Sequence, residues 1–435
     1  MNGALDWMRV RGAAAHETIM AVSGEENALG VYVSIPFCRS KCTYCNFASG
    51  VYPASQHARY IDRVIEDLRQ AGSWAAQAGV QLPRRVDTVY LGGGTPNLLA
   101  PDLLSRLLAA LRSEFAVDND AEITMECAPG QFAEGTLEAM AEAGVNRASL
   151  GVQSFVDSEA RASGRLHTRA AVEEDLRHLR SAGITNLNLD LIAGLAGQTL
   201  ASWEESLRAL VDSGVPHASV YMLEVDEDSR LGRELLAGGA RYHAQAVPTD
   251  DAIARMYERA IEKLAAAGIE QYEISNFSRP GFASRHNLRY WQRRPYLGVG
   301  LDASSMLWLA EPTLCGEERR ERSPVLRSKT ADDLGGYLAG AGPVETAWLS
   351  CGQQHEEAWF LGLRLNAGIH LAALEAEFGR ARVEPARAVA LRLAEDGLLA
   401  FRGNSARLTA RGRLVSNDVF QEFLGLAPES TLAVQ

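Results

Sequence analysis

The stretch Pro36-Phe37-Cys38-Arg39-Ser40-Lys41-Cys42-Thr43-Tyr44-Cys45-Asn46-Phe47 carries its cysteines in the spacing Cys-x3-Cys-x2-Cys. Three thiolates can hold a cubane iron–sulfur cluster and leave one iron without a protein ligand, whereas an electron-transfer cluster is held by four cysteines. The spacing therefore predicts a cluster with an open iron, bound by Cys38, Cys42 and Cys45. Zinc and plain loop thiols stay open as alternatives at this point.

The other cysteines give zinc and disulfides little support. Cys127, Cys315 and Cys351 stand alone, so no second closely spaced pair completes a zinc site. Six cysteines in 435 residues do not form the dense framework of a small secreted protein.

A glycine segment follows an apolar run at residues 86–91 and reads Gly92-Gly93-Gly94-Thr95-Pro96. Glycine permits a close approach of the backbone to a ligand. Because α/β folds bind ligands at the carboxyl ends of their strands, this segment is a candidate binding loop.

Strand-like and helix-like stretches alternate along the first two thirds of the chain, which predicts parallel βαβ units. The expected strands are residues 31–35, 86–91, 122–126, 147–151, 186–192 and 219–224, and the expected helices include 58–70, 103–111, 170–179 and 203–211. The alternation fades after residues 272–275. Six strands suit an incomplete barrel better than an eight-stranded one.

The composition limits which classes of protein this chain can belong to. The chain is long enough for two domains, and its 47% hydrophobic and 23% charged residues are ordinary for a globular protein. A net charge of −12 argues against a nucleic-acid partner. No apolar run reaches the length of a membrane span, and the first 25 residues lack the apolar stretch of a signal peptide. We therefore expect a cytoplasmic location, with peripheral membrane association as a further expectation.

The cysteine spacing and the glycine segment resemble the radical S-adenosylmethionine (SAM) superfamily. The resemblance implies an incomplete (β/α)6 barrel, a [4Fe-4S] cluster and SAM as cofactors, with Gly93, Gly94 and Thr95 at the methionine amino group of SAM. It also implies that an electron from the cluster can cleave SAM to methionine and a 5′-deoxyadenosyl radical.

From about residue 30 to about residue 423 the chain resembles the oxygen-independent coproporphyrinogen oxidase group, and within it the HemW-type heme chaperone branch. The oxidases carry a fourth cysteine two residues beyond the third, where Phe47 stands here. In addition, His286-Asn287-Leu288-Arg289-Tyr290-Trp291 matches the His-Asn-x-x-Tyr-Trp signature of the chaperone branch.

Polar residues at successive strand ends match the SAM ligands of the oxidase group by position. They are Tyr32, Glu126, Gln153, Arg165 and Asp190. Taken singly, each is better explained as a strand-end residue satisfied by water or backbone. Together they form a cradle, because a carboxylate can accept ribose hydroxyls and Arg165 can pair with the methionine carboxylate. Asp190 lies in an apolar strand, where a charge needs a partner.

His286 is the candidate heme ligand, since histidine is a common proximal ligand of heme iron, and Tyr290 and Trp291 can pack against a porphyrin. Without the resemblance, a histidine beside Tyr-Trp is more often a loop histidine next to a buried anchor residue than a heme ligand. The resemblance implies a heme chaperone that delivers heme to an acceptor protein, with a membrane-bound respiratory enzyme as a candidate acceptor. The alternative is the oxidase, which decarboxylates coproporphyrinogen III to protoporphyrinogen IX. If SAM is cleaved, an electron donor such as flavodoxin or ferredoxin is needed.

The family run Gly-x-Gly-x-Gly-Ala-His-Ser is changed here, because Asp302 replaces its last glycine and Ser304 its histidine.

The predicted domains are residues 1–29 as a disordered tail, 30–275 as the partial barrel, 276–345 as the heme-motif segment and linker, 346–425 as a smaller, mainly helical, winged-helix-like domain, and 426–435 as a tail. Helices at 356–365, 371–378 and 386–396 and strands at 399–401 and 406–408 are expected in that last domain. Residues 317–322 are a charged run typical of a solvated linker, and Met20 is a candidate initiator.

Overall fold

A curved sheet of thirteen strands forms the centre of the computed structural model, which describes residues 28–309, 325–340 and 343–426. Its middle consists of parallel strands in the order β1 (Leu29–Ile35), β3 (Arg85–Gly93), β4 (Ala116–Cys127), β5 (Arg147–Gln153), β6 (Asn186–Ala193) and β7 (His217–Met222). Each corresponds to one strand predicted from the sequence, so the predicted partial barrel is confirmed.

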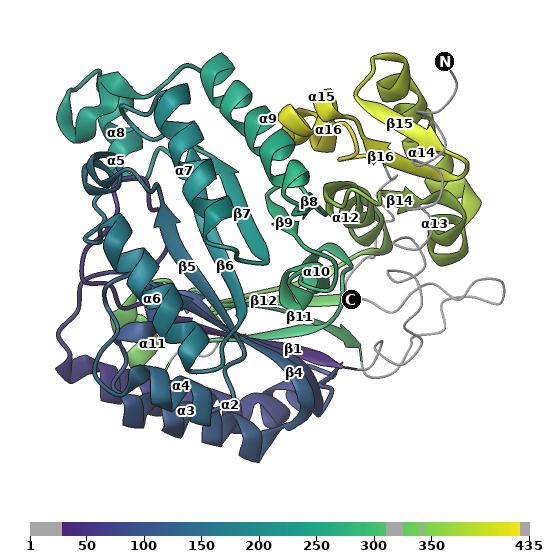
Figure 1. Ribbon diagram of the computed structural model, residues 1–435. Helices are drawn as coiled ribbons and strands as arrows, with labels where there is room; N and C mark the ends of the chain where they lie inside the picture. The colour runs from purple at the N-terminus through teal and green to yellow at the C-terminus, as the bar shows by residue number, and fades with distance from the viewer. Residues whose placement is uncertain (1–27, 310–324, 341–342, 427–435) are drawn as a thin grey trace.

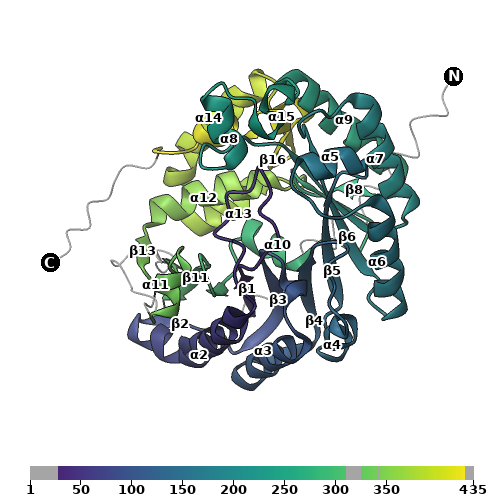
Figure 2. The ribbon, with the colours of Figure 1, turned by 90° about the vertical axis from the view of Figure 1, so that its left-hand side faces the viewer.

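Helices cover the outer, convex face of this sheet (Figures 1 and 2). They are α2 (Ser55–Gln77), α3 (Pro101–Glu114), α4 (Thr136–Glu142), α6 (Arg169–Ser181), α7 (Leu200–Asp212) and α9 (Asp250–Ala266), with the short α5 (Asp157–Ala162) and α8 (Arg230–Leu236) between them. Each long helix turns an apolar stripe to the sheet; α3, for example, buries Leu104, Leu107, Leu108 and Leu111. β5, in the middle of the sheet under these helices, is buried along its whole length.

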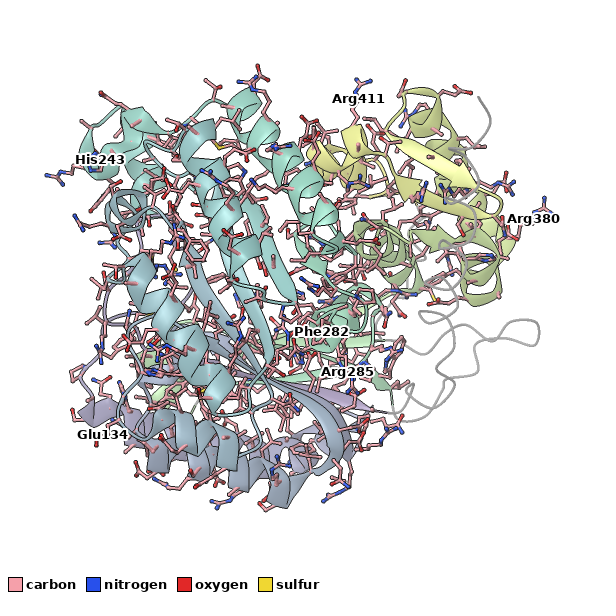
Figure 3. The ribbon with its side chains drawn as sticks, in the orientation of Figure 1. Glu134, His243, Phe282, Arg285, Arg380 and Arg411 are labelled. Carbon is pink, nitrogen blue, oxygen red and sulfur yellow. The ribbon has the colours of Figure 1, made fainter. Side chains whose placement is uncertain are left out.

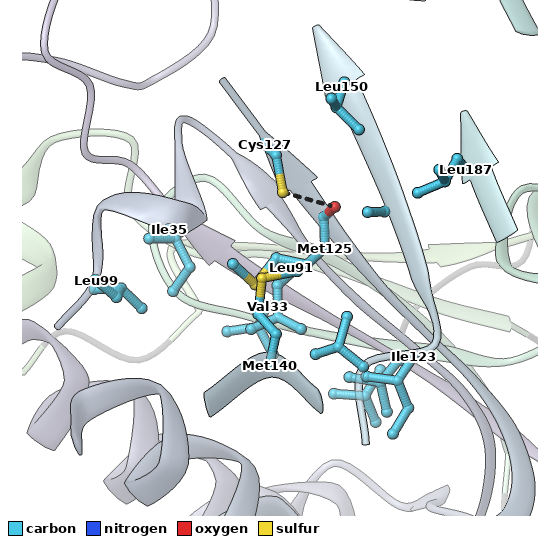
Figure 4. Packing of buried hydrophobic residues seen from close by; sticks show 14 of the residues in the cluster. Val33, Ile35, Leu91, Leu99, Ile123, Met125, Cys127, Met140, Leu150 and Leu187 are labelled. Atoms are coloured by element: carbon cyan, nitrogen blue, oxygen red, sulfur yellow. Dashed lines mark hydrogen bonds between the residues drawn. The ribbon is translucent and has the colours of Figure 1, made fainter. Parts of the chain in front are cut away.

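Figure 4 shows the packing of side chains from neighbouring strands and α4 in the core, including Val33, Leu91, Met125 and Met140. Cys127 belongs to this core: its Sγ donates to the Met125 carbonyl at 3.6 Å, and burial raises the pKa of its thiol well above the usual range. Burial with a raised thiol pKa makes Cys127 a poor nucleophile, although the residue also borders the cavity described below.

The sheet continues beyond the predicted strands at both edges. β10 (Tyr296–Val299) pairs in parallel with β1, and β11 (Ser304–Leu309), β12 (Val325–Lys329) and β13 (Glu345–Leu349) follow antiparallel, with β2 (Val80–Gln81) beside β11. At the other edge lie β9 (Asn276–Ser278) and β8 (Glu270–Gln271).

The strands β10 to β13 lie within or across residues 276–345, which the sequence assigned to a motif segment and linker. These short strands have only the five-residue helix α11 (Leu334–Leu338) among them, between β12 and β13. They therefore lack the regular βα alternation that identified the barrel, and periodicity did not find them. The domain boundaries stay a prediction. The charged run 317–322, Cys315 and Met20 lie outside the described residues.

A smaller helical domain follows and has its own core. It contains α12 (Cys351–Arg364), α13 (Leu371–Phe378), α14 (Arg380–Glu395), α15 (Ala410–Leu414) and α16 (Ser416–Gln421), with β14 (Ile369–His370), β15 (Leu399–Arg402) and β16 (Ser405–Leu408) as a small sheet. The rings of Trp359 and Phe423 stack at 4.7 Å in its centre. The predicted helical domain with a β-hairpin wing is confirmed.

This domain, at the yellow end of the colour scale, lies beside α9 and β8 (Figure 1). Asn366 N donates to the Tyr272 carbonyl at 2.9 Å, and the Arg364 guanidinium lies 4.3 Å from the centre of the Trp291 ring. In the part of the chain that the structure describes, no helix combines the length and the apolar character needed to cross a membrane.

Candidate functional site

A cavity of about 1190 Å³ opens at the carboxyl ends of the parallel strands. It brings together most of the site residues predicted from the sequence, namely Cys38, Cys42, Cys45, Gly93, Gly94, Thr95, Glu126, Gln153, Arg165 and Asp190. Tyr32 and His286 are not among its lining residues. Parallel strands end at one edge of a sheet, which is why residues more than a hundred positions apart in the sequence meet here.

The cysteine loop follows β1 and is fixed to its surroundings by hydrogen bonds. The backbone N–H of Cys38 donates to the Gly50 carbonyl at 2.9 Å, and Thr43 N donates to the Ser163 carbonyl at 3.0 Å. Lys41 Nζ donates to the carbonyls of Phe47 and Ser49 at 2.6 and 2.9 Å. These bonds hold the loop at the cavity.

The thiols line the cavity without forming a closed metal site. Thr95 Oγ1 donates to Cys38 Sγ at 3.7 Å, and burial raises the pKa of the Cys38 thiol. Among the described residues, no three His, Cys, Asp or Glu side chains converge closely enough to hold a metal ion. Because metal ligation requires the thiolate, we expect metal loading to release protons at this loop.

The glycine segment at the end of β3 lies directly against the cysteine loop. A Cβ at Gly94 would stand 2.6 Å from the Ile35 carbonyl oxygen, so only glycine fits there. Gly93 N donates to Glu126 Oε2 at 3.0 Å, which joins the glycine segment to the neighbouring strand.

Arg165 lies across β5, over Gly151. A Cβ on Gly151 would stand 2.4 Å from Arg165 Nη2, so the missing side chain leaves room for the guanidinium. Arg165 Nε and Gln153 Oε1 are buried in the described structure without a hydrogen-bond partner. Gln153 also has a positive φ of 67°, which is uncommon for a residue with a side chain and is frequent at binding sites. These unpaired groups fit a polar ligand in the cavity.

Glu126 lies near the end of β4 and Asp190 lies within β6, and their carboxylates are close enough to interact electrostatically. Burial and the negative charge of Asp190 raise the pKa of Glu126 to about 7, and burial also raises the pKa of Asp190. Tyr90 Oη donates to Glu126 Oε1 at 2.9 Å, while Asn188 Nδ2 donates to Asp190 Oδ1 at 2.7 Å. Two partly buried acids at one cavity suit a ligand with hydroxyl or cationic groups.

The raised pKa of Glu126 makes stability depend on pH in the protein without cofactors. The folded state holds the proton more tightly than the unfolded chain, whose carboxyl titrates near 4.5. The free energy of unfolding is therefore expected to fall as pH rises from about 5 to about 7 and then to level off. Glu126→Gln removes this titration, so its stability relative to wild type should rise by on the order of 2 kcal/mol across that range. Denaturant titrations of wild type and Glu126→Gln at several pH values measure the difference in the free energy of unfolding. A constant difference across this pH range would show that the pKa of Glu126 is not raised.

Tyr32 lies beneath the cavity. Its ring stacks near that of Tyr90 with the centroids 6.1 Å apart, and a Cβ on Gly93 would stand 3.2 Å from Tyr32 Oη. Tyr32 therefore supports the glycine segment from below, and its role as a SAM ligand stays a prediction.

His286 is fully buried in α10 (Arg285–Trp291) and lies away from the cavity lining. Its Nδ1 is 3.0 Å from Thr88 Oγ1 and its Nε2 is 2.9 Å from Tyr290 Oη, so both ring nitrogens have partners. Burial, with the nearby charges of Arg289 and Arg147, lowers the pKa of His286 to about 3. The Trp291 ring packs under Arg364, which lines the cavity, while Trp291 itself is not a lining residue. The role of His286 as a heme ligand stays a prediction, and this environment does not favour it.

Some cavity residues were not predicted. Leu414, Val415, Ser416, Asn417 and Asp418 of the helical domain form one wall, and Tyr221 at the end of β7 is 41% exposed. Tyr221 could have been found as a strand-end residue, but no local pattern indicates that a separate domain closes the site.

The two departures from the family run lie outside the cavity lining. Asp302 has a φ of 56° and pairs with Lys329 at 2.8 Å. Aspartate is one of the few residues that tolerate this conformation, so it can replace the glycine of the family. Ser304 begins β11 with an exposed side chain.

Comparison with known families agrees with this geometry. Residues 32–210 match the Radical SAM superfamily, and residues 352–415 match the HemN C-terminal domain. The first match covers the cysteine loop and β1 to β6, and the second covers most of the helical domain.

Curated relatives match along nearly the whole chain. Heme chaperone HemW of Bacillus subtilis is 33% identical over 397 residues, which are 91% of this chain and 98% of that protein. Heme chaperone HemW of Mycobacterium tuberculosis is 34% identical over 402 residues, which are 91% and 95% of the two chains. The chain belongs to the HemW family of the radical SAM superfamily. Heme chaperone HemW of Lactococcus lactis is similar at 31% identity over 90% of this chain and 96% of its own.

A solved structure supports the fold of this HemW family member. Coproporphyrinogen III oxidase (HemN) from Escherichia coli superposes with a TM-score of 0.76, over 92% of this chain and 91% of that chain, at 22% identity. At this identity the likeness establishes a shared architecture of partial barrel and helical domain.

Proposed function

We propose that this protein is a heme carrier which holds a [4Fe-4S] cluster and SAM in the cavity and delivers heme to an acceptor protein. Membership of the HemW family supports this function. The observation that carries it is the size of the cavity. A pocket for one small molecule usually measures roughly 300–1,000 Å³, so the 1190 Å³ here leaves room for a ligand beside SAM.

We assign the cluster and SAM to the part of the cavity that the cysteine loop, the glycine segment and the polar strand residues line. Cys38, Cys42 and Cys45 would hold the cluster, and SAM would bind its open iron. Arg165, with an unpaired Nε, would pair with the SAM carboxylate, and Glu126 and Asp190 would accept its hydroxyl groups. When bound, these cofactors supply one-electron chemistry. The residues of the chain orient SAM and keep solvent from it.

We assign heme to the exposed apolar part of the cavity lining. Phe47 and Leu166 line the cavity and are 65% and 61% exposed, although large apolar side chains are usually buried. A porphyrin face is the apolar surface that we assign to these side chains. Arg39, exposed beside Cys38 on the same lining, is the charge partner that we assign to the heme carboxylates.

The position of these residues also suits delivery. A ligand held at an open mouth by apolar contact can pass to a second protein without unfolding of the carrier. The acceptor that we propose is a heme protein docking at this mouth, with a membrane-bound respiratory enzyme as the candidate. The carrier would act in the cytoplasm, and flavodoxin or ferredoxin would supply electrons if SAM is cleaved.

The double variant Phe47→Ser/Leu166→Ser tests the heme site. Loss of two apolar contacts is expected to weaken heme binding by about tenfold or more. Heme titration followed by absorbance measures the affinity. Leu391→Ser is the matched control, because Leu391 is 49% exposed on α14 and does not line the cavity. Equal affinities in wild type and the double variant would reject this heme site.

A further inference from the structure

The helix that carries the His-Asn signature is held inside the barrel by buried groups. After the turn at Phe282, α10 begins at Arg285; both side chains are labelled in Figure 3. The Glu122 carboxylate of β4 accepts from the backbone N–H groups of Arg285 and His286, each at 3.0 Å. Arg289, one turn further on, pairs with Asp87 of β3. The signature helix is therefore fixed to two neighbouring strands.

Within this helix, His286 faces the sheet and contacts Tyr90. The two ring centroids lie 5.3 Å apart, and Tyr32 flanks Tyr90 at 6.1 Å. Thr88 and Tyr290 hold the His286 ring through both nitrogens. The Tyr90 ring thus lies between side chains whose positions are themselves fixed by hydrogen bonds and packing.

The hydroxyl of Tyr90 links it to residues that line the cavity. Tyr90 Oη donates to Glu126 Oε1 at 2.9 Å, and the other oxygen of that carboxylate accepts from Gly93 N at 3.0 Å. Both Glu126 and Gly93 line the cavity. A continuous set of contacts therefore runs from His286 through Tyr90 to two groups of the SAM cradle.

We infer that His286 is a positioning residue of the SAM site, which acts by holding Tyr90 against Glu126, and is not a ligand of heme iron. The inference rests on the proposed function only in taking SAM as the ligand of the cradle. A histidine that is fully buried, with both nitrogens in hydrogen bonds, offers no nitrogen to an iron without breaking one of them.

A second histidine is used in the same way on the other side of the barrel. His217, fully buried in β7, contacts Asn188 Oδ1 through Nδ1 at 2.6 Å, and Asn188 Nδ2 donates to Asp190. Each carboxylate of the cradle is thus backed by a buried histidine through one intervening polar side chain. This parallel supports a positioning role for His286.

SAM affinity tests the inference, measured by anaerobic equilibrium dialysis of the cluster-loaded protein. Tyr90→Phe removes the hydroxyl that holds Glu126 and is expected to weaken SAM binding by about tenfold. His286→Gln, which retains hydrogen-bonding groups but is a poor iron ligand, should weaken it several-fold. Because both changes act through one contact, the double variant should lose little more than Tyr90→Phe alone. Heme stoichiometry in the same samples should match wild type.

Tyr337→Phe is the control for general destabilisation. Tyr337 Oη also donates to a carboxylate, that of Asp67, but neither residue lines the cavity. This variant should lower the melting temperature and leave SAM affinity unchanged. The electron paramagnetic resonance spectrum of the reduced cluster gives a second readout, because its response to SAM should weaken in Tyr90→Phe and persist in Tyr337→Phe.

The opposite pattern would overturn the inference: loss of heme in His286→Gln with SAM affinity intact, or additive losses in the double variant. Failure of the proposed function would give a different experimental result. A wild-type protein that binds SAM but no heme would reject the carrier, and the SAM affinities of the variants would still decide the role of His286.

Discussion

Replacement of Cys38, Cys42 or Cys45 by Ala is expected to abolish the broad brown absorbance of the anaerobically reconstituted protein. All three thiols line one cavity, and the loop that carries them supplies every protein ligand that we assign to the cluster. With two thiolates left, a second iron loses its protein ligand and the cluster should not persist. Iron and sulfide content per chain, together with the absorbance spectrum, measures the loss.

Cys351→Ala is the matched control, because Cys351 begins α12 in the helical domain and does not line the cavity. It should retain the full cluster, and Cys315→Ala should do the same. An equal loss of iron in either control would contradict the ligand assignment.

Arg289→Met is expected to destabilise the fold by about 3–5 kcal/mol, because removal of one partner leaves the other as an unpaired buried charge. Arg289 and Asp87 are both about 2% exposed and form an ion pair between α10 and β3. Arg289 also donates to the carbonyls of Ala28 and Pro295 at 2.8 and 3.0 Å. Denaturant titration measures the change in the free energy of unfolding.

The double variant Arg289→Met/Asp87→Leu separates the ion pair from packing. Replacement of both charges by apolar groups should recover much of the stability lost in Arg289→Met. If Arg289→Met were as stable as wild type, the Arg289–Asp87 ion pair would not be what fixes α10. Arg85→Met is the control, because Arg85 lies at the exposed start of β3, and it should change the free energy of unfolding little.

The barrel and its ligand edge could be predicted because they depend on local patterns. Apolar runs such as 186–192 alternate with helical periods, and parallel strands bring Gly93, Glu126 and Asp190 to one edge whatever the details of packing. The cysteine spacing identified the loop directly. These features need no knowledge of which side chains meet across the core.

Other features depend on contacts between distant segments, and the sequence did not indicate them. β10 and β12 are short strands whose positions depend on pairing with β1, β11 and β13. The environment of His286 is set by Thr88 and Tyr90, almost two hundred residues earlier in the chain. A family signature identified His286 as important, but its burial could be read only from the fold.

An anaerobic heme titration of the cluster-loaded protein, with parallel assays for 5′-deoxyadenosine and for oxidised porphyrin, tests the carrier function most directly. The proposed function predicts saturation near one heme per chain, affinity reduced in Phe47→Ser/Leu166→Ser, and no conversion of coproporphyrinogen III. Absence of saturable heme binding, together with SAM cleavage and formation of protoporphyrinogen IX, would contradict it and identify the protein as the oxidase.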